Sequence, residues 1–461
     1  MTKLLDDFRA EFKKSKNKGN QEASGDVMYP TGFLNFDYLN GTRIYVKSDK
    51  LEMNYPSIGI MDGTAVQLIG RTHCGKTTFG VQLAANIIRP YKTSMIFHDD
   101  IEGGCNSRRY EILTRFTQEQ LKDKYVYRNT GITLENFFKR IKVIHDLKIA
   151  DPETYMYDTG LYDFKGERIF KYEPTVYIVD SIPMLMPEDV LEKDELSGQM
   201  TATSMAKGNT MVFKRITQLC KEANIILITV NHILQDVQIN PMMHKKTTIP
   251  GLKQGERLPG GQTAQYLAGT LVRVDVGSKL KPDETFGISG FIGEFQVIKS
   301  RTNFAGRSVP MIFNQATGFD NELSLFQLLK NNNKINGAGS HLYLGDRDDI
   351  KFSMKTFKTT LKEYPELRKI LALEALPILE SLLSNTDEYG YIAEEETNED
   401  INSLIIGISS GTIEIDRDEI NTPKGTTKEK PSKKKQTIMD VLGSDLNTTN
   451  DDDFYDEDEV A

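Results

Sequence analysis

The chain has 461 residues, 38% of them hydrophobic, no tryptophan and a formal net charge of −9. This length suffices for one large core and one or two smaller domains, and no stretch is apolar over the length of a transmembrane span. The acidic N-terminus does not have the pattern of a signal peptide. Three widely spaced cysteines predict reduced thiols, and we expect a cytoplasmic protein with no membrane partner.

The first residues predict an isolated amphipathic helix. Residues 3–16 place four apolar side chains on one helical face, and a polar linker follows at 16–26. Such a stripe must be covered, either by the rest of the chain or by a neighbouring subunit. We therefore expect residues 1–28 to form an N-terminal helix and linker that take part in oligomerisation. The apolar residues are Leu4, Leu5, Phe8 and Phe12.

A phosphate-binding loop is the most specific single motif. Residues 70–78 read Gly-Arg-Thr-His-Cys-Gly-Lys-Thr-Thr, between an apolar run at 64–69 and a helical pattern at 79–88. This is G-x-x-x-x-G-K-[ST] in a strand–loop–helix context, where backbone N–H groups and a helix N-terminus hold phosphates. Lys76 is expected to reach the β- and γ-phosphates, and Thr77 to bind Mg²⁺. The predicted nucleotide-binding residues are Gly70, Arg71, Thr72, His73, Cys74, Gly75, Lys76, Thr77 and Thr78.

Short apolar runs alternate with helical patterns through the middle of the chain. The runs at 94–97, 175–179 and 225–230 are almost wholly apolar, as strands buried on both faces are. This predicts an α/β fold with a mainly parallel sheet and crossover helices. The runs at 270–276 and 294–298 alternate more, and we expect them to be antiparallel additions at one side of the sheet.

Polar residues follow three predicted strands, at the edge where parallel α/β sheets bind ligands. Asp180 ends the strand at 175–179 and is expected to hold Mg²⁺. Three carboxylates follow the strand at 94–97, and one of them could polarise the attacking water. Two neutral hydrogen-bonding residues follow the strand at 225–230 and could sense the γ-phosphate. The carboxylates are Asp99, Asp100 and Glu102, and the neutral residues are Asn231 and His232.

Later segments have weaker signals. Turn residues at 151–172 indicate an inserted hairpin, and 355–384 has a helical pattern within a predicted small C-terminal domain at 331–420. Residues 421–461 are rich first in Lys, Ser, Thr and Pro and then in acid, which predicts disorder. Residues 440–461 contain nine acidic and no basic residues. This tail is either a solubiliser or a polyanion that competes with nucleic acid for a basic groove.

The ordered set of motifs resembles RecA-type recombinases, closest to the UvsX-like proteins of tailed phages. Each motif by itself is shared with other ATPases, whereas the order over residues 29–320 is much more specific. The resemblance implies a RecA-like ATPase and DNA-binding core at 29–330. The matching segments are 31–37, the phosphate loop, Asp100 to Glu102, Asp180 with Ser181, Asn231 with His232, Gly260 with Gly261, and Lys299 to Thr302.

The resemblance also implies roles for the site residues. Glu102 would activate water, and the two polar residues after the third strand would sense the γ-phosphate. Lys299 and Arg301 would reach across to the ATP site of the neighbouring protomer. The adenine would stack on Tyr110. The implied catalytic residues are Glu102, Lys76, Lys299 and Arg301, and the implied metal ligands are Thr77 and Asp180.

Two loops are assigned to DNA by the resemblance. The first, at 186–199, is itself acidic, but a basic helix follows it. The second, at 235–259, interleaves basic and apolar side chains, which can neutralise phosphates and wedge between bases. A mobile surface loop is the alternative for this second segment. The residues expected to contact DNA are Lys207, Lys245, Lys246, Lys253 and Arg257.

The function implied by the resemblance is that of a DNA-dependent ATPase with ATP and Mg²⁺ as cofactors. It would form homo-oligomeric helical filaments on single-stranded DNA and pair them with homologous double-stranded DNA, in recombination, repair and recombination-dependent replication. Single-strand-binding and mediator proteins would be further partners, and the host cytoplasm the location if the source is a phage. The alternatives are a hexameric helicase of the same superfamily and a nucleotide-gated DNA-binding scaffold without turnover.

Overall fold

The computed structural model describes residues 26–48, 51–103, 106–163, 166–191, 198–235, 251–259, 265, 268–283 and 286–383. The chain divides into two units, residues 1–384 and 385–461, and every described residue belongs to the first unit. The predicted N-terminal helix and acidic tail therefore lie outside the described residues. In the described part, no helix is both long and apolar enough to cross a membrane.

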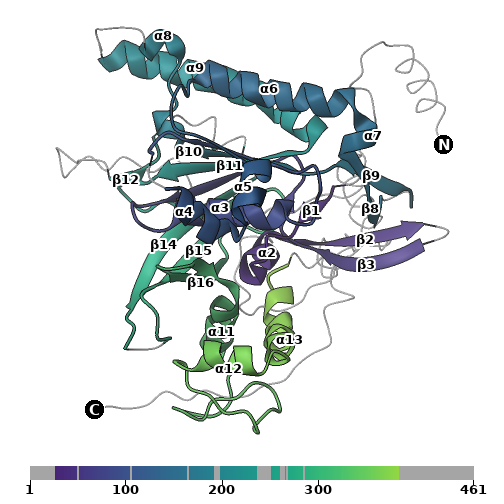
Figure 1. Cartoon of the computed structure of the whole chain (residues 1–461), viewed down its shortest axis with the longest axis vertical. Coiled ribbons are helices and arrows are strands. Elements are labelled where there is room, and N and C mark those ends of the chain that lie inside the picture. The colour runs from purple at the N-terminus through teal and green to yellow at the C-terminus, as the bar shows by residue number, and fades with distance from the viewer. Residues whose placement is uncertain are drawn as a thin grey trace, which may run out of the picture. The chain divides into compact units, whose positions relative to one another are not determined.

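A nine-stranded sheet organises the described residues (Figure 1). Six adjacent strands are parallel and three at one side are antiparallel, so the prediction of a mixed α/β fold with a mainly parallel sheet is confirmed. In spatial order the strands are β17 (Gly318–Asp320), β16 (Ser308–Asn314), β15 (Gly290–Ser300), β14 (Thr270–Leu280), β5 (Ala65–Gly70), β11 (Ile225–His232), β10 (Thr175–Asp180), β6 (Ile96–Asp100) and β7 (Tyr125–Arg128).

The prediction for β14 was wrong in one respect. This strand is parallel to β5, with Val272 opposite Leu68, and antiparallel only to β15. The alternation that suggested an antiparallel addition has a different cause. Arg273 and Asp275 interrupt the apolar run because they form an ion pair. The strand then continues past the end of β5, where residues 276–279 are exposed.

Helices cover both faces of the sheet, which explains the wholly apolar strands. In β10, Val176 and Ile178 face a cluster that includes α3 (Lys76–Ile88), whereas Tyr177 and Val179 face α6 (Leu134–Ala150) and α9 (Gly198–Ala223). Helices α6 and α9 run along the upper side of the sheet in Figure 1. On the α3 side, α4 (Ser107–Thr114) and α5 (Gln118–Lys124) complete the cover.

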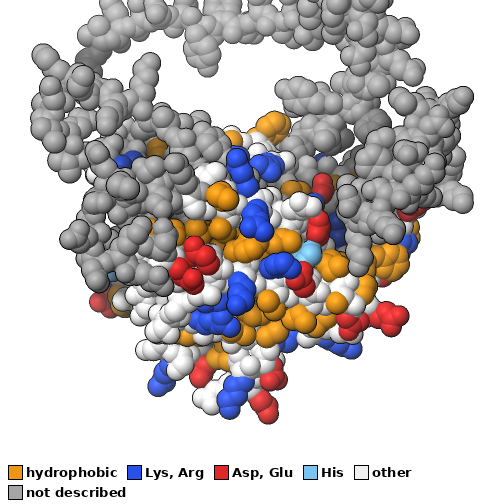
Figure 2. Space-filling view, turned by 90° about the horizontal axis from the view of Figure 1, so that it is seen from above, with side chains coloured by type: hydrophobic (Ala, Val, Ile, Leu, Met, Phe, Trp, Pro, Cys, Tyr) orange, Lys and Arg blue, Asp and Glu red, His pale blue; other side chains and the backbone are white. Residues whose placement is uncertain are grey.

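The outer surface of α6 and α9 is mixed in character. Figure 2, seen from above, shows hydrophobic and basic side chains close together on this side of the molecule. Val143 and Leu147 on α6 and Met211 on α9 are at least half exposed. The guanidinium of Arg215 lies 4.4 Å from the ring centroid of Phe138, which ties the two helices together.

Two hairpins project from the core. The hairpin predicted at 151–172 is confirmed: β8 (Met156–Tyr162) and β9 (Arg168–Tyr172) are antiparallel and follow the single turn of α7 (Pro152–Tyr155). The hydroxyl of Tyr157 on this hairpin donates to that of Tyr29 over 3.1 Å. The second hairpin is formed by the antiparallel strands β2 (Thr42–Ser48) and β3 (Leu51–Ser57). The remaining elements of this region are β1 (Met28–Tyr29), α2 (Leu34–Asn40) and β4 (Ile60–Met61).

The helical pattern near the end of the described chain is confirmed as two helices, α12 (Phe357–Glu363) and α13 (Leu367–Glu380). They share one hydrophobic cluster with α11 (Asn321–Asn331), where the rings of Phe326 and Phe357 lie 4.5 Å apart. Residues of α2 and β16 belong to the same cluster. The described part of the predicted C-terminal domain is thus packed on the antiparallel side of the sheet.

Candidate nucleotide-binding site

The phosphate loop lies between the end of β5 and the start of α3. Gly75 has a φ of +86°, and a Cβ there would lie 3.0 Å from the ring of Phe319, so the turn requires glycine. The side chain of Lys76 is buried, and its Nζ donates to the carbonyl oxygens of Gly70 at 3.0 Å and Arg71 at 2.7 Å. The lysine of the phosphate loop is therefore held by two carbonyl oxygens of the loop itself.

Thr77 and Asp180 are brought together as the sequence predicts. The Thr77 hydroxyl donates to Oδ2 of Asp180, while Oδ1 of Asp180 is buried without a hydrogen-bond partner among the described residues. Burial raises the pKa of Asp180 to about 7, and the nearby carboxylates of Glu102 and Asp100 also raise it. An unpartnered buried carboxylate oxygen beside a hydroxyl is a donor set that fits Mg²⁺.

Glu102 lies at the same edge of the sheet. Its Oε1 accepts from the Ser181 hydroxyl at 2.6 Å and lies 2.8 Å from Nε2 of His232. Partial burial raises the pKa of Glu102, but these two contacts and the charge of Lys76 outweigh it, and the net pKa is lowered. Glu102 is thus ionised at neutral pH, which the polarisation of a water requires.

The other two carboxylates after β6 have structural contacts. Asp99 forms an ion pair with Arg140 at 2.6 Å and accepts a hydrogen bond from Tyr177. Asp100 accepts from the backbone N–H of Gly103 at 2.8 Å, so it holds the turn that carries Glu102. Of the three carboxylates, only Glu102 lines the cavity at the phosphate loop.

A cavity of about 790 Å³ extends from the phosphate loop along the ends of β14, β15 and β16. This volume is within the range of small-molecule pockets. Its apolar lining includes Phe291 and Phe313, whose rings stack with centroids 4.6 Å apart, and the ring of Phe313 lies next to Gly75 of the phosphate loop. Cationic side chains on the lining are those of Lys76, Arg109, Lys279 and Lys281.

The structure does not place Tyr110 in this cavity. Its side chain is 4% exposed and packs 5.1 Å, between ring centroids, from both Tyr125 and Tyr127. The preceding residue, Arg109, lines the cavity and donates to the carbonyl oxygen of Ala316 at 2.8 Å. Consecutive helical residues point about 100° apart, so Arg109 can face the cavity while the ring of Tyr110 is buried.

The end of β11 connects the nucleotide site to the second predicted DNA loop. Nδ2 of Asn231 donates to the carbonyl oxygen of Pro259 at 3.0 Å, and its Oδ1 accepts from the N–H of His232. Just beyond, β12 (Leu234–Gln235) pairs with β13 (Glu256–Arg257) and closes the base of the loop.

The structure describes only some of the predicted DNA-binding residues. Lys253 and Arg257 are exposed at the loop base. Lys207 belongs to α9, but its side chain is outside the description. Lys245, Lys246, Gly260 and Gly261 lie outside the described residues. Of the first predicted DNA loop at 186–199, the structure describes 186–191, which includes α8 (Glu188–Leu191), and 198–199, while η1 (Ile182–Met184) precedes the loop.

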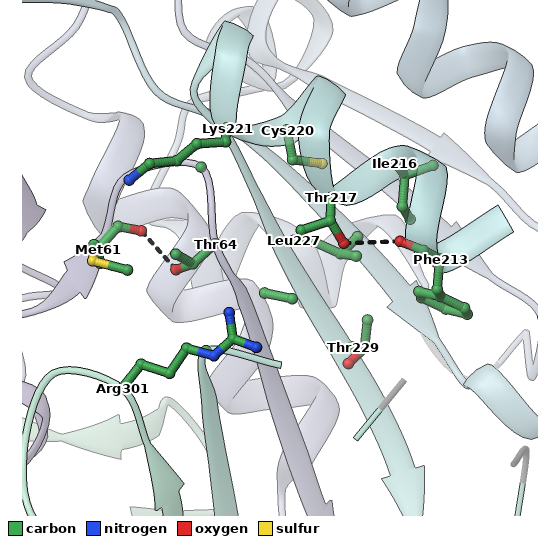
Figure 3. Close-up of a pocket in the computed structure, with 13 residues that line it drawn as sticks. Met61, Thr64, Phe213, Ile216, Thr217, Cys220, Lys221, Leu227, Thr229 and Arg301 are labelled. Atoms are coloured by element: carbon green, nitrogen blue, oxygen red, sulfur yellow. Dashed lines mark hydrogen bonds between the residues drawn. The ribbon is translucent and has the colours of Figure 1, made fainter. Parts of the chain in front are cut away.

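Lys299 and Arg301 do not line the phosphate-loop cavity of their own chain. Nζ of Lys299 donates to the carbonyl oxygen of Gln265 at 3.0 Å, and burial together with the charge of Arg301 lowers the pKa of Lys299. Arg301 lines a second cavity of about 260 Å³ with Thr64 and Thr229 (Figure 3). This cavity is at the opposite end of β5 from the phosphate loop, roughly 16 Å away along the strand.

Comparison with known proteins supports the nucleotide site in general terms. The chain is 26% identical over 210 residues to the energy-coupling factor transporter ATP-binding protein EcfA2 of Clostridium perfringens (strain 13 / Type A), a match that covers 41% of this chain and 67% of that protein. No protein-family model matches the chain. This distant similarity to an ATP-binding protein agrees with the phosphate loop, whose residues fit a nucleoside triphosphate with Mg²⁺. It carries no information on DNA or recombination.

Proposed function

We propose that the protein is an ATP-dependent DNA recombinase. It assembles as helical filaments on single-stranded DNA and catalyses homologous pairing and strand exchange. One observation carries the proposal: two consecutive residues at the end of β11 contact the nucleotide site and the loop assigned to DNA. His232 lies 2.8 Å from Glu102, and Asn231 donates to the carbonyl oxygen of Pro259. A change at the γ-phosphate can thus be passed from His232 to the adjacent Asn231 and from there to the loop.

The proposed hydrolysis uses residues at or just after the ends of three parallel strands, β5, β10 and β6. The ionised Glu102 positions and polarises the attacking water, and Lys76 exchanges its carbonyl partners for β- and γ-phosphate oxygens. Mg²⁺ held by Thr77 and Asp180 would supply neutralisation of the charge on those oxygens. Lys299 and Arg301 stabilise the same charge in the phosphate site of the adjacent protomer.

The rest of the cavity fits an adenosine. Arg109 offers a planar cation for stacking on the base, and the apolar wall at Phe291 and Phe313 lies on the lining of the same cavity. Sequence-tolerant contacts of the loop at 235–259 would hold single-stranded DNA, and base pairing with the duplex would supply sequence recognition.

The deciding experiment is the ATPase rate with and without single-stranded DNA, combined with negative-stain images and a strand-exchange assay. Stimulation by DNA, helical filaments and exchanged strands are expected. Closed rings that unwind forks would identify a helicase. DNA binding without turnover would identify a nucleotide-gated scaffold, and turnover indifferent to DNA would contradict all three functions.

A further inference from the structure

A buried ion pair fastens the end of the predicted DNA loop to the sheet. Glu256 is fully buried at its side chain, and Arg273 on β14 is 2% exposed. The guanidinium of Arg273 donates to both carboxylate oxygens of Glu256, at 2.6 and 3.1 Å. It also donates to the carbonyl oxygen of Gly251 at 3.2 Å. We call residues 251–259 the loop-end segment, because these contacts hold both its start and its centre.

Further contacts complete this attachment. The N–H of Lys253 donates to Oε2 of Glu256 at 2.8 Å, and Leu252 and Leu258 pack on an apolar cluster that includes Ile69 of β5. Burial raises the pKa of Glu256, but the hydrogen bonds from Arg273 and Lys253 outweigh it and the net pKa is lowered. Glu256 is therefore a buried, ionised group in a fixed position.

The same carboxylate is in contact with the phosphate loop. Nη2 of Arg71 lies 3.6 Å from Oε1 of Glu256, although the Arg71 side chain is 61% exposed. The carbonyl oxygen of Arg71 is also one of the two that accept from Nζ of Lys76. One residue of the phosphate loop thus contacts the phosphate-binding lysine through its backbone and the loop-end segment through its side chain.

We propose that Glu256 is a positioning residue that passes the nucleotide state of the phosphate loop, through Arg71, to the loop-end segment. When phosphates bind, Lys76 gives up the Arg71 carbonyl, and the backbone at Arg71 is free to shift. Glu256 stays bound to Arg273, so a shift of the Arg71 guanidinium strengthens or weakens its ion pair with Glu256 and thereby alters the position of the loop-end segment. The inference rests on the proposed function in taking this segment as part of a DNA-binding loop. Asn231 provides a second, separate contact at Pro259.

A fluorescent reporter tests the link without DNA. Because the chain has no tryptophan, Leu258→Trp places a single reporter at the packed face of the loop-end segment. Titration with Mg²⁺-ATP should change its emission, while a labelled ATP analogue confirms nucleotide saturation in every variant. Adding Arg71→Gln should reduce the change by at least about half, and Arg71→Lys should restore part of it. Arg168→Gln removes a comparable exposed ion pair with Asp158 on the β8–β9 hairpin and should leave the change intact.

A thermodynamic cycle supplies the second measurement. The factor by which Mg²⁺-ATP alters the affinity for a labelled oligo-dT should fall about two- to fivefold in Arg71→Gln, as expected for a half-exposed ion pair. Glu256→Gln should lower it similarly, and the double variant should show no further loss. If Glu256→Gln fails to fold because Arg273 is left unpaired, Arg71→Gln and its control still decide the question.

The outcomes separate this inference from the function on which it rests. Nucleotide that binds with an unchanged reporter signal in Arg71→Gln, or additive losses in the double variant, would overturn the link while leaving the ATP site intact. A protein that binds ATP but no DNA, with a reporter signal that depends on Arg71, would support the link and refute the recombinase proposal.

Discussion

Oε1 of Glu102 and Nε2 of His232 lie 2.8 Å apart, although the two residues are 130 positions apart in the sequence. The hydroxyl of Ser181 reaches the same oxygen, Oε1, from a third strand end. The other oxygen, Oε2, makes no hydrogen bond to any residue in the described ranges, so it can accept one from a water. The contact therefore orients a carboxylate and joins the ends of β6 and β11 at the point where ATP hydrolysis is proposed.

Replacement of Glu102 tests this role. Glu102→Gln should lower the ATPase rate at least about 100-fold, because the amide is a far weaker base, while ATP binding is retained. The rate should be measured by phosphate release and binding by a labelled nucleotide. A rate within threefold of the original would assign water activation to another group.

Mixing experiments test the trans role of Arg301. Arg301→Ala and Lys76→Ala should each be inactive, yet their mixture should recover part of the DNA-stimulated ATPase rate, because the intact Arg301 of one chain meets the intact phosphate loop of the other. The matched control is a mixture of Lys76→Ala with Glu102→Gln, in which no phosphate site is intact. Equal inactivity of both mixtures would contradict a role in trans.

Two adjacent residues of α4, Arg109 and Tyr110, can be tested for stacking on the nucleotide base. Arg109→Ala should weaken ATP binding about three- to tenfold, because a stacking cation on the cavity lining is lost. Tyr110→Leu, which removes the ring, should leave the affinity within twofold, since that ring is buried among other aromatic side chains and does not line the cavity. Calorimetric titration measures both variants, and a larger effect of Tyr110→Leu in a folded protein would support stacking of the base on Tyr110.

Lys148 on α6 should make stability depend on alkaline pH. Burial lowers the pKa of Lys148 to about 7, although its Nζ donates to the carbonyl oxygen of Glu173. The unfolded chain then binds the extra proton between pH 7 and 10.5, so this residue costs less stability as the pH rises through that window. Relative to Lys148→Met, the original protein should gain on the order of 2–3 kcal/mol between pH 7 and 9.5.

Denaturant unfolding of both proteins at the two pH values measures this difference, and other groups that titrate in the window cancel in the comparison. A difference that does not change with pH would show that Lys148 is not buried as described. A difference that moves in favour of Lys148→Met would contradict the sign of the shift.

Patterns in consecutive residues predict the buried strands and the phosphate loop of this protein. A strand buried on both faces, such as β10, requires a continuous apolar run, and the tight turn of the phosphate loop requires glycines at fixed positions. The meeting of Thr77, Asp180 and Glu102 follows from strands that end at one edge.

Contacts between residues that only the folded chain brings together cannot be predicted from such patterns. The polar residues Arg273 and Glu256 are 17 positions apart and give no periodic signal, yet their bond explains both the interrupted run in β14 and the fixed end of the loop. The aromatic character of Tyr110 is visible in the sequence, whereas the direction in which its side chain leaves α4 is not.

The separation of the Arg301 cavity from the phosphate loop, at opposite ends of β5, has a consequence for assembly. The proposed contact between Arg301 and the neighbour's phosphate loop would join unlike surfaces, so the proposed polymer would be directional and could not close as a symmetric dimer. Each open chain of subunits then has one exposed phosphate loop at one terminus and one unused arginine at the other. Specific activity per subunit should rise with polymer length, because every open polymer contains one complete site fewer than its number of subunits.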